Sequence, residues 1–174
     1  GILFVLANLE KEFKLNLRQT FLFSTLAWLM VAIFGSLPFL LSANEFTISE
    51  AFFESMSGIT TTGATIISDL DNSPKSILLW RAIMQWLGGI GIVVMAITIL
   101  PLLKVGGMQL FKMEGPDTTE KILPRTIEVA AIIISTYIAL TFLCGLFYWL
   151  FGMSIFDSVC HAMTTIATGG FSTH

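Results

Sequence analysis

The sequence predicts an all-α integral membrane protein made of repeated units, each with a membrane span, a short re-entrant helix with its loop, and a second span. Three observations predict this fold class. First, 55% of the 174 residues are hydrophobic and only 12% are charged, with a mean hydropathy of +0.83, whereas soluble domains carry about 25% charged residues. Second, three long runs contain no charged residue. Third, a loop rich in threonine and glycine occurs twice, so we expect about one and a half units in this chain.

The first 19 residues are predicted to hold the end of a preceding helix and a cytoplasmic connector. Residues 1–9 are apolar but too few to cross a bilayer, which takes roughly 20 residues as a helix. Residues 10–18 mix basic and acidic side chains, as a connector at the membrane surface does. Because the chain starts with glycine and stops directly after the second loop, we expect it to be part of a longer protein.

The first complete unit is predicted over residues 20–103, and it begins with a span over about residues 20–41. Pro38 is expected to kink or end that helix, because proline lacks a backbone donor. A second span is predicted over about residues 77–103. The glycines of its GGIG run at residues 88–91 are expected to let neighbouring helices approach closely, since no strand precedes them as a nucleotide-binding loop requires.

A short polar segment separates these two spans. Thr47 or Ser49 is expected to cap a helix over about residues 49–58, whose first turn holds Glu50 in a favourable place for a carboxylate. The helix leads into TTTGAT at residues 60–65, a run with no charge and almost no hydrophobic bulk. Such a run packs poorly in a core, but its carbonyls and hydroxyls suit a polar path.

The second unit is predicted over residues 126–174, after a cytoplasmic connector at residues 104–125. It starts with a span over about residues 126–151 and continues with a second short helix over residues 154–163. A second loop rich in threonine and glycine follows at residues 163–172. The unit is therefore truncated after its loop.

The two short helices contain a similar triplet, FES at residues 53–55 and FDS at residues 156–158. From that match, the second helix is expected to be about one turn longer than the first. The register of the second loop is then open by one residue. Pairing Gly63 with Gly170 is favoured, because the residues that follow each glycine then correspond.

Charge placement predicts the orientation in the membrane. The segments before the first span and after the second hold seven of the nine Lys and Arg residues, and basic connectors stay in the cytoplasm. The short helix and its loop are therefore expected to enter from the outside. Non-helical backbone at membrane depth must be buried in protein or face water, so such a loop offers carbonyls to a dehydrated cation. One loop cannot make a ring of ligands, whereas four equivalent loops can.

Four stretches together carry a resemblance to a known family. They are SGITTTGAT at residues 57–65, WRAIMQWLGGIGI at residues 80–92, GMQLFKMEGP at residues 107–116 with a later Pro-Arg pair, and ATGGFSTH at residues 167–174. The chain resembles the TrkH family, the membrane subunits of bacterial Trk-type potassium uptake systems, which is related to the Ktr and plant HKT transporters. The resemblance covers nearly the whole chain, although the connector at residues 113–121 is a few residues shorter than the family pattern.

The resemblance implies a potassium-channel-like fold, in which the remaining repeats of the same polypeptide complete a four-unit pore. It implies a multi-pass protein of the bacterial inner membrane that is no enzyme, takes up potassium as its transported ligand, alone or by symport, and needs no cofactor. The implied partners are the lipid bilayer, a second copy in a homodimer and a cytosolic ring of nucleotide-binding regulatory subunits, with no nucleic acid. The family's potassium filter, with one key glycine in each loop, corresponds to these residues: Thr61, Thr62, Gly63, Ile166, Ala167, Thr168, Gly169 and Gly170.

Other functions and roles stay open at the level of the sequence. A non-transporting membrane scaffold is one alternative, and an intramembrane enzyme is a weaker one because no nucleophile–base set is present. Glu54 and Asp157 either attract cations to the pore mouth or hold the short helices. Arg81 either snorkels to the surface or pairs with an acidic loop residue. His161 is expected to pack on the second short helix rather than to bind a metal.

Overall fold

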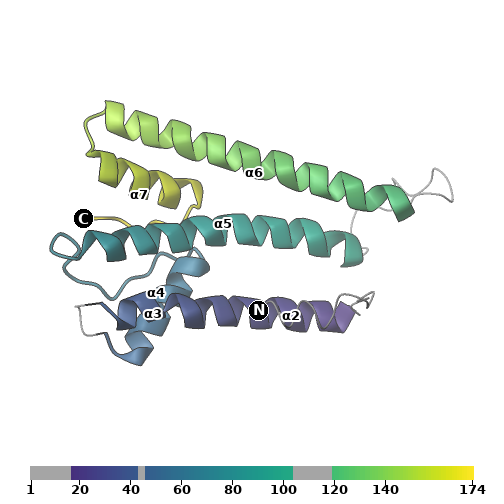
Figure 1. Ribbon diagram of the computed structural model, residues 1–174, viewed down its shortest axis with the longest axis horizontal. Coiled ribbons are helices and arrows are strands. Elements are labelled where there is room, and N and C mark those ends of the chain that lie inside the picture. Colours follow the sequence, from purple (N-terminus) through teal and green to yellow (C-terminus); the bar gives the residue numbers. More distant parts are fainter. Residues whose placement is uncertain (1–16, 43–45, 104–118) are drawn as a thin grey trace, which may run out of the picture.

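The computed structural model describes residues 17–42, 46–103 and 119–174, and all regular structure in these ranges is helical. The helices are α2 (Leu17–Gly35), α3 (Leu37–Leu40), α4 (Ile48–Ile59), α5 (Lys75–Leu103), α6 (Thr119–Leu150) and α7 (Ile155–Ile166). In Figure 1 the long helices α2, α5 and α6 run alongside one another, α4 crosses α2 and contacts α5, and α7 lies between α5 and α6. The predicted all-α class is confirmed.

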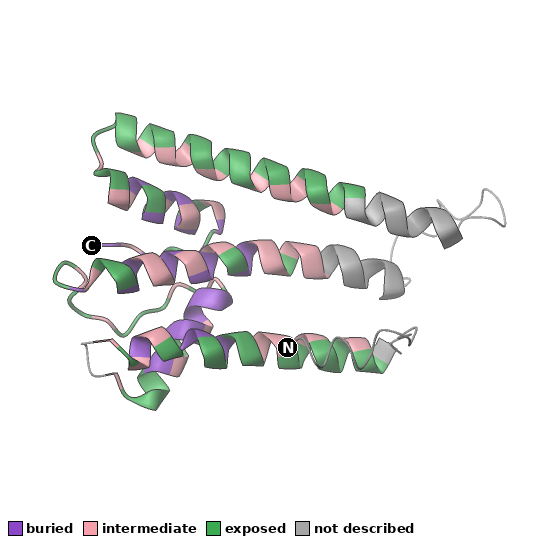
Figure 2. Cartoon of the chain, viewed as in Figure 1, coloured by how far each residue is buried: buried purple, intermediate pink, exposed green. Residues whose placement is uncertain are grey.

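Within the described residues, three helical stretches are long and apolar enough to cross a membrane: Arg18–Leu40, Lys75–Met95 and Glu128–Leu150. They coincide with the three predicted spans, although α6 already begins at Thr119, inside the predicted connector. The predicted helix end at residues 1–9 and most of both connectors lie outside the described residues. Because the apolar side chains on the outer faces of α2 and α6 are exposed within this chain (Figure 2), these faces are suited to lipid or to further apolar helices.

The central helix is α5. Of the residues in its most apolar 18-residue stretch, 44% are buried inside the chain, against 0% for the corresponding stretch of α6. A Cβ added at Gly88 would lie 2.0 Å from the carbonyl oxygen of Ile59, the last residue of α4, and a Cβ at Gly89 would lie 3.1 Å from Ala167, directly after α7. These glycines therefore let α5 touch the carboxyl ends of both short helices, as predicted for the GGIG run.

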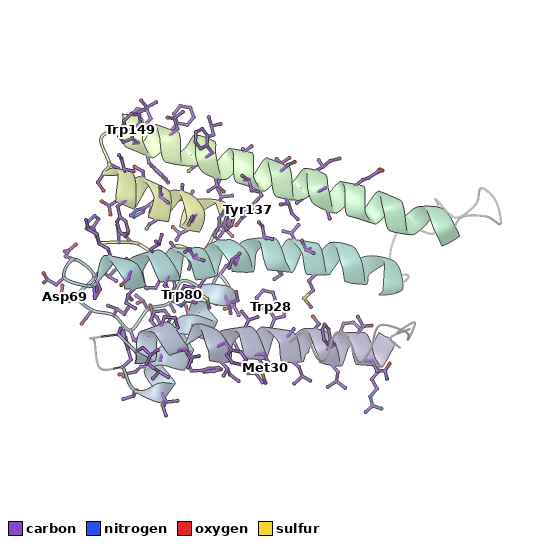
Figure 3. The ribbon with its side chains drawn as sticks, in the orientation of Figure 1. Trp28, Met30, Asp69, Trp80, Tyr137 and Trp149 are labelled. Carbon is purple, nitrogen blue, oxygen red and sulfur yellow. The ribbon has the colours of Figure 1, made fainter. Side chains whose placement is uncertain are left out.

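Aromatic side chains complete the contacts of α5 with its neighbours. The Trp80 indole donates to the carbonyl of Gly35 at the end of α2, at 2.9 Å. On the other side, the Tyr137 hydroxyl of α6 donates to the carbonyl of Trp86 at 3.1 Å. Figure 3 shows Trp80 directed towards α2 and Tyr137 between α6 and α5, whereas Trp149 points away from the protein.

Helix α2 ends before Pro38. The chain turns at Ser36, whose amide donates to the carbonyl of Ala32 at 3.0 Å, and α3 then begins at Leu37. Pro38 lies in the first turn of α3, where a missing amide hydrogen breaks no helical bond. The predicted end of the helix near this proline is confirmed.

The short helices α4 and α7 each have 12 residues, and each leads into a loop. Loop 1 is residues 60–65, after α4, and loop 2 is residues 167–172, after α7. The helix caps correspond: the Thr47 hydroxyl accepts from the Glu50 amide at 3.3 Å, and the Ser154 hydroxyl accepts from the Asp157 amide at 3.2 Å. Of the two predicted cap residues, Thr47 and Ser49, Thr47 is the cap.

These caps correct the predicted match between the two units. Glu50 and Asp157 occupy the same position in their helices, so Glu54 corresponds to His161 and not to Asp157. The expectation that the second helix is one turn longer was wrong for the same reason. It rested on the similar FES and FDS triplets, whereas the start of a helix is set by the side chain that caps its free amides.

Candidate functional site

Loop 1 and loop 2 share one backbone conformation. Thr61 and Thr168 have φ angles of 56° and 55°, and Gly63 and Gly170 have φ angles of 77° and 81°. Positive φ is a genuine outlier for a β-branched residue, and such strain collects at functional sites. Both pairs are 107 residues apart, which agrees with the predicted pairing of Gly63 with Gly170.

The hydrogen bonds at the start of each loop also correspond. The Thr62 amide donates to the carbonyl of Ser57 at 3.0 Å, and the Gly169 amide donates to the carbonyl of Thr164 at 2.9 Å. Both acceptors lie in the last turns of their helices. The turn therefore uses the loop amides internally and ends each helix in the same way.

Most loop carbonyls, in contrast, have no protein donor. Within the described residues, no hydrogen bond reaches the carbonyl oxygens of residues 60–63, or those of Ala167, Thr168 and Gly170. In loop 2 the Gly169 carbonyl alone among residues 167–170 accepts one, from a side chain of α5. Unpaired carbonyls are ready acceptors for water or for a cation.

The two loops meet at their glycines. A Cβ added at Gly63 would lie 1.9 Å from the carbonyl oxygen of Gly169, a distance that no real contact allows. Gly63 is therefore required by its positive φ and by its neighbour. Gly170 has open space within 4 Å, so only its φ requires glycine.

The structure brings the predicted site residues together, with one of them still helical. Ile166 is the last residue of α7, and Ala167 is its C-cap. Thr168 and Gly170 are exposed, whereas Gly169 is buried. The residues of both loops that were selected from the sequence thus lie on two short segments that contact each other.

Glu54 holds loop 1 from inside the protein. Its side chain is 0% exposed and accepts from the Thr65 hydroxyl at 2.8 Å and from the Ile66 amide at 3.2 Å. It also forms an ion pair with Arg81 of α5 at 2.8 Å. Of its two open roles, the structure supports the holding one.

Arg81 does not snorkel to the surface. Its side chain is 1% exposed, and its partner Glu54 lies on a helix rather than on a loop. A second bond runs from its terminal nitrogen to the carbonyl of Ser172 in loop 2, at 3.2 Å, and the guanidinium carbon lies 4.0 Å from the centre of the Phe171 ring. Arg81 therefore contacts loop 2 and the residue that holds loop 1.

His161 takes the place of Glu54 in the second unit. Its Nε2 lies 3.1 Å from the Ser172 hydroxyl, as Glu54 contacts the corresponding Thr65 hydroxyl. Its Nδ1 donates to the carbonyl of Asp157 at 2.9 Å, because a carbonyl can only accept. His161 packs on α7 as predicted.

Asp157 connects the start of α7 to the segment after loop 2. It bonds the cap residue Ser154 at 2.5 Å and accepts from the Thr173 hydroxyl at 2.8 Å. The hydrogen bond from Ser154 is the main cause of its lowered pKa. This geometry supports the holding role for Asp157 as well.

Sequence reasoning missed Gln85, which is 0% exposed and bonds loop 2 from α5. The available signal was an amide in the middle of an apolar span, four residues after Arg81 and hence on the same helix face. Polar groups inside a membrane helix are rare and often functional.

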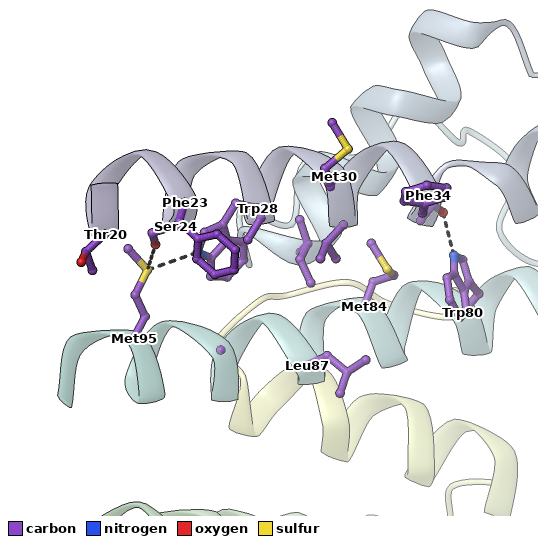
Figure 4. A pocket seen from close by; sticks show the side chains of 15 residues that line it. Thr20, Phe23, Ser24, Trp28, Met30, Phe34, Trp80, Met84, Leu87 and Met95 are labelled. Atoms are coloured by element: carbon purple, nitrogen blue, oxygen red, sulfur yellow. Dashed lines mark hydrogen bonds between the residues drawn. The ribbon is translucent and has the colours of Figure 1, made fainter. Parts of the chain in front are cut away.

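A separate apolar hollow of about 750 Å³ lies between α2 and α5. Figure 4 shows its lining, in which the Ser24 hydroxyl and the Trp28 indole both donate to the Met95 sulfur at 3.2 Å. The walls are nearly all apolar and contain no charged side chain, so the hollow is poorly suited to a cation. No group of three or more His, Cys, Asp and Glu residues suited to a metal occurs in the described ranges either.

Membrane-length helices that bracket two short helices, each ending in a threonine–glycine loop, define a multi-span membrane protein with paired helix–loop units. The chain belongs to the TrkH family of cation transport proteins, whose family model matches residues 3–174. The family predicted from the sequence is confirmed.

Named relatives and one solved structure show how far the similarity extends. The chain is 50% identical over 154 residues to the Trk system potassium uptake protein TrkI of Halomonas elongata, covering 88% of this chain and 31% of that protein. It is 46% identical over 170 residues to TrkH of Escherichia coli strain K12, covering 96% and 35%. The crystal structure of the potassium transporter TrkH from Vibrio parahaemolyticus matches with a TM-score of 0.78 and 43% identity, over 95% of this chain and 32% of that one. The chain therefore spans about a third of the length of these relatives.

Proposed function

We propose that this chain belongs to a potassium uptake protein and supplies two of the segments that select the ion. In this proposal Thr61, Thr62 and Gly63, together with residues 166–170, are the potassium filter. The observation that carries it is the matching pair of loops, which meet at glycines and leave most of their carbonyls without a donor. The potassium uptake proteins among the relatives support the choice of ion.

The chemistry follows from the hydration of the ion. A potassium ion enters a filter when rings of backbone carbonyls replace its water. Two loops supply half of a four-membered ring, and the remaining repeats of the same polypeptide supply the rest. The positive φ values at Gly63 and Gly170 set the direction of the neighbouring carbonyls. Selection therefore depends on backbone geometry more than on side-chain charge.

The setting is the bacterial inner membrane, with the loops entering from the outside. The basic residues of the two flanking segments support this orientation. The protein works as a homodimer with a cytosolic ring of nucleotide-binding regulatory subunits, a proposal that rests on the family alone. Transport is passive or weakly coupled to a second ion as symport.

The test is Gly63→Ala in the full-length protein. A side chain there strains a positive φ and meets the Gly169 carbonyl, so we expect the potassium-to-sodium permeability ratio to fall about tenfold, the equivalent of about 1.4 kcal/mol. Ion flux through reconstituted protein measures the ratio.

Gly152→Ala is the matched control. Gly152 has φ 102° and open space around it, but it lies between α6 and α7 and away from both loops. We expect this variant to insert less well and to keep the wild-type permeability ratio. An unchanged ratio in Gly63→Ala would remove the filter assignment.

A further inference from the structure

Two buried polar side chains on one face of α5 contact loop 2. Arg81 and Gln85 are four residues apart, one helical turn, and they are 1% and 0% exposed. Within the described residues, α5 and α7 are the helices whose side chains form hydrogen bonds with loop 2. The first unit therefore holds the loop of the second.

Gln85 uses both ends of its amide. Its Nε2 donates to the carbonyl of Gly169 at 2.9 Å, and its Oε1 accepts from the amide of Phe171 at 3.1 Å. One bond needs a donor and the other an acceptor, so together they fix which end of the amide faces Gly169 and which faces Phe171. They span Gly170, the positive-φ glycine of loop 2.

The identity of residue 169 follows from this contact. A Cβ added at Gly169 would lie 2.3 Å from the Cδ of Gln85. The corresponding residue of loop 1 is Thr62, which has a side chain and is exposed. The Nε2 of Gln85 lies 3.6 Å from a Cβ added at Gly63, so Gln85 lies where the two loops meet.

We propose that Gln85 determines the ion preference of the filter as a positioning residue, by fixing which carbonyls of loop 2 are free for the ion. The inference rests on the proposed potassium filter. With the amide bonded, the Gly169 carbonyl is occupied, while those of Thr168 and Gly170 have no donor. Without it, a buried carbonyl and a buried amide lose their partners, and the peptide planes on both sides of Gly170 turn to find new ones.

The first experiment is Gln85→Leu in the full-length protein, which keeps the approximate volume and removes both hydrogen bonds. We expect the potassium-to-sodium permeability ratio of the inserted protein to fall about thirtyfold, because each buried hydrogen bond that is lost shifts a loop equilibrium by about fivefold. A merely structural role would lower the amount of inserted protein and leave the ratio unchanged. If Gln85→Leu fails to insert, Gln85→Glu replaces it and is measured at alkaline pH, since an ionised Glu keeps the acceptor for Phe171 and lacks the donor to Gly169.

A second experiment tests the contact itself. Gly169→Ala alone forces a clash with Gln85, whereas Gly169→Ala combined with Gln85→Ala relieves it. We expect the double variant to insert better than Gly169→Ala and to keep the low permeability ratio of Gln85→Ala. Additive losses in both measurements would contradict the inference.

Thr141→Val is the control. It removes the 3.0 Å hydrogen bond that the Trp86 indole of α5 donates to the Thr141 hydroxyl of α6. Trp86 is the residue directly after Gln85. We expect the wild-type ratio in this variant, and a lowered ratio there would overturn the specific role of Gln85. If Gly63→Ala lowers the ratio and the Gln85 variants do not, the inference fails and the proposed filter stands. If neither lowers it, the filter proposal fails.

Discussion

The two helix–loop units have matching backbone angles in their loops, but different side chains hold those loops in place. In the first unit, Glu54 of the short helix reaches its own loop and is charge-balanced by Arg81. In the second unit, the corresponding His161 contacts the Ser172 hydroxyl, and α5 supplies the other side-chain hydrogen bonds to the loop. Equivalent loop geometry therefore does not require equivalent support.

The difference explains residues that the repeat does not conserve between its copies. Loop 1 has Thr62 where loop 2 has Gly169, because the amide of Gln85 fills the space beside residue 169. The Thr62 hydroxyl instead lies 2.8 Å from the hydroxyl of Thr60 within its own loop. A ring built from such units is only approximately symmetric, and each position is adjusted by the helix next to it.

The largest expected effect separates the two supports. Glu54→Gln leaves the buried guanidinium of Arg81 without its countercharge, which costs about 3–5 kcal/mol in buried pairs. His161→Gln changes a contact worth about 1 kcal/mol. We expect the first variant to reach the membrane poorly and the second almost normally, measured as folded protein per cell by size-exclusion chromatography.

Equal losses in these two variants would show that the units are supported alike. Glu54→Gln combined with Arg81→Met is the matched control, since it removes both charges. Replacing both members of a buried pair by apolar or neutral groups is often tolerated, so this double variant should recover part of the folded protein.

The next effect compares the positive-φ glycines of the two loops. Gly170→Ala strains φ but meets no atom within 4 Å, whereas Gly63→Ala also meets the Gly169 carbonyl. We expect Gly170→Ala to lower the potassium-to-sodium permeability ratio by a smaller factor than Gly63→Ala, about fivefold for a strain near 1 kcal/mol. Flux measurements on both variants in parallel decide the order, and a larger effect at Gly170 would contradict the contact between the loops.

A smaller effect compares the two caps. Thr47→Ala and Ser154→Ala each remove a hydroxyl that accepts from the first turn, at a cost of about 1 kcal/mol. At Thr47 the Glu50 carboxylate also accepts from the cap amide at 2.8 Å, so part of the cap survives the substitution. We expect the thermal midpoint in detergent to fall more for Ser154→Ala, with Ser49→Ala, an exposed position in α4, as the control that changes little.

The sequence predicted the parts of this molecule that local composition determines. Uncharged runs located the three spans, and the repeated threonine and glycine residues located both loops, because each signal lies within about 20 neighbouring residues. The pairing of Gly63 with Gly170 also came from neighbours in the chain. The length of α7 was predicted wrongly, because the two units were aligned on the similar FES and FDS triplets instead of on their helix caps.

The supports of the loops depend on long-range contacts that no local pattern contains. Gln85 bonds residues 84 and 86 positions further along the chain, and Arg81 bonds one 91 positions away. A single sequence shows that both are polar side chains in an apolar helix, and it does not show which loop they face. The choice between snorkelling and pairing for Arg81 was decided by three-dimensional packing alone.

The smallest expected effect concerns His174, which follows loop 2. His174 contacts Asp71 at 2.8 Å and Asp157 at 3.6 Å; His174 and Asp71 are exposed, whereas Asp157 is partly buried. The hydrogen bond with Asp71, followed by the charge of Asp157, raises the pKa of His174. A raised pKa in the folded state means that the contact stabilises the protein fully below the unfolded value of about 6.5 and is lost as pH rises through the folded value.

We therefore expect the thermal midpoint of the full-length protein to fall slightly between about pH 6 and pH 8, the range in which histidine loses its charge. His174→Gln should remove this slope, and Asp71→Asn should weaken it, since each variant deletes one member of the main contact. Asp157 adds the opposite trend at lower pH: its lowered pKa gives a stabilisation that is lost as acid protonates it. If the thermal midpoint of His174→Gln still falls over this pH range, the slope has another origin. The contact between His174 and Asp71 would then contribute nothing to stability.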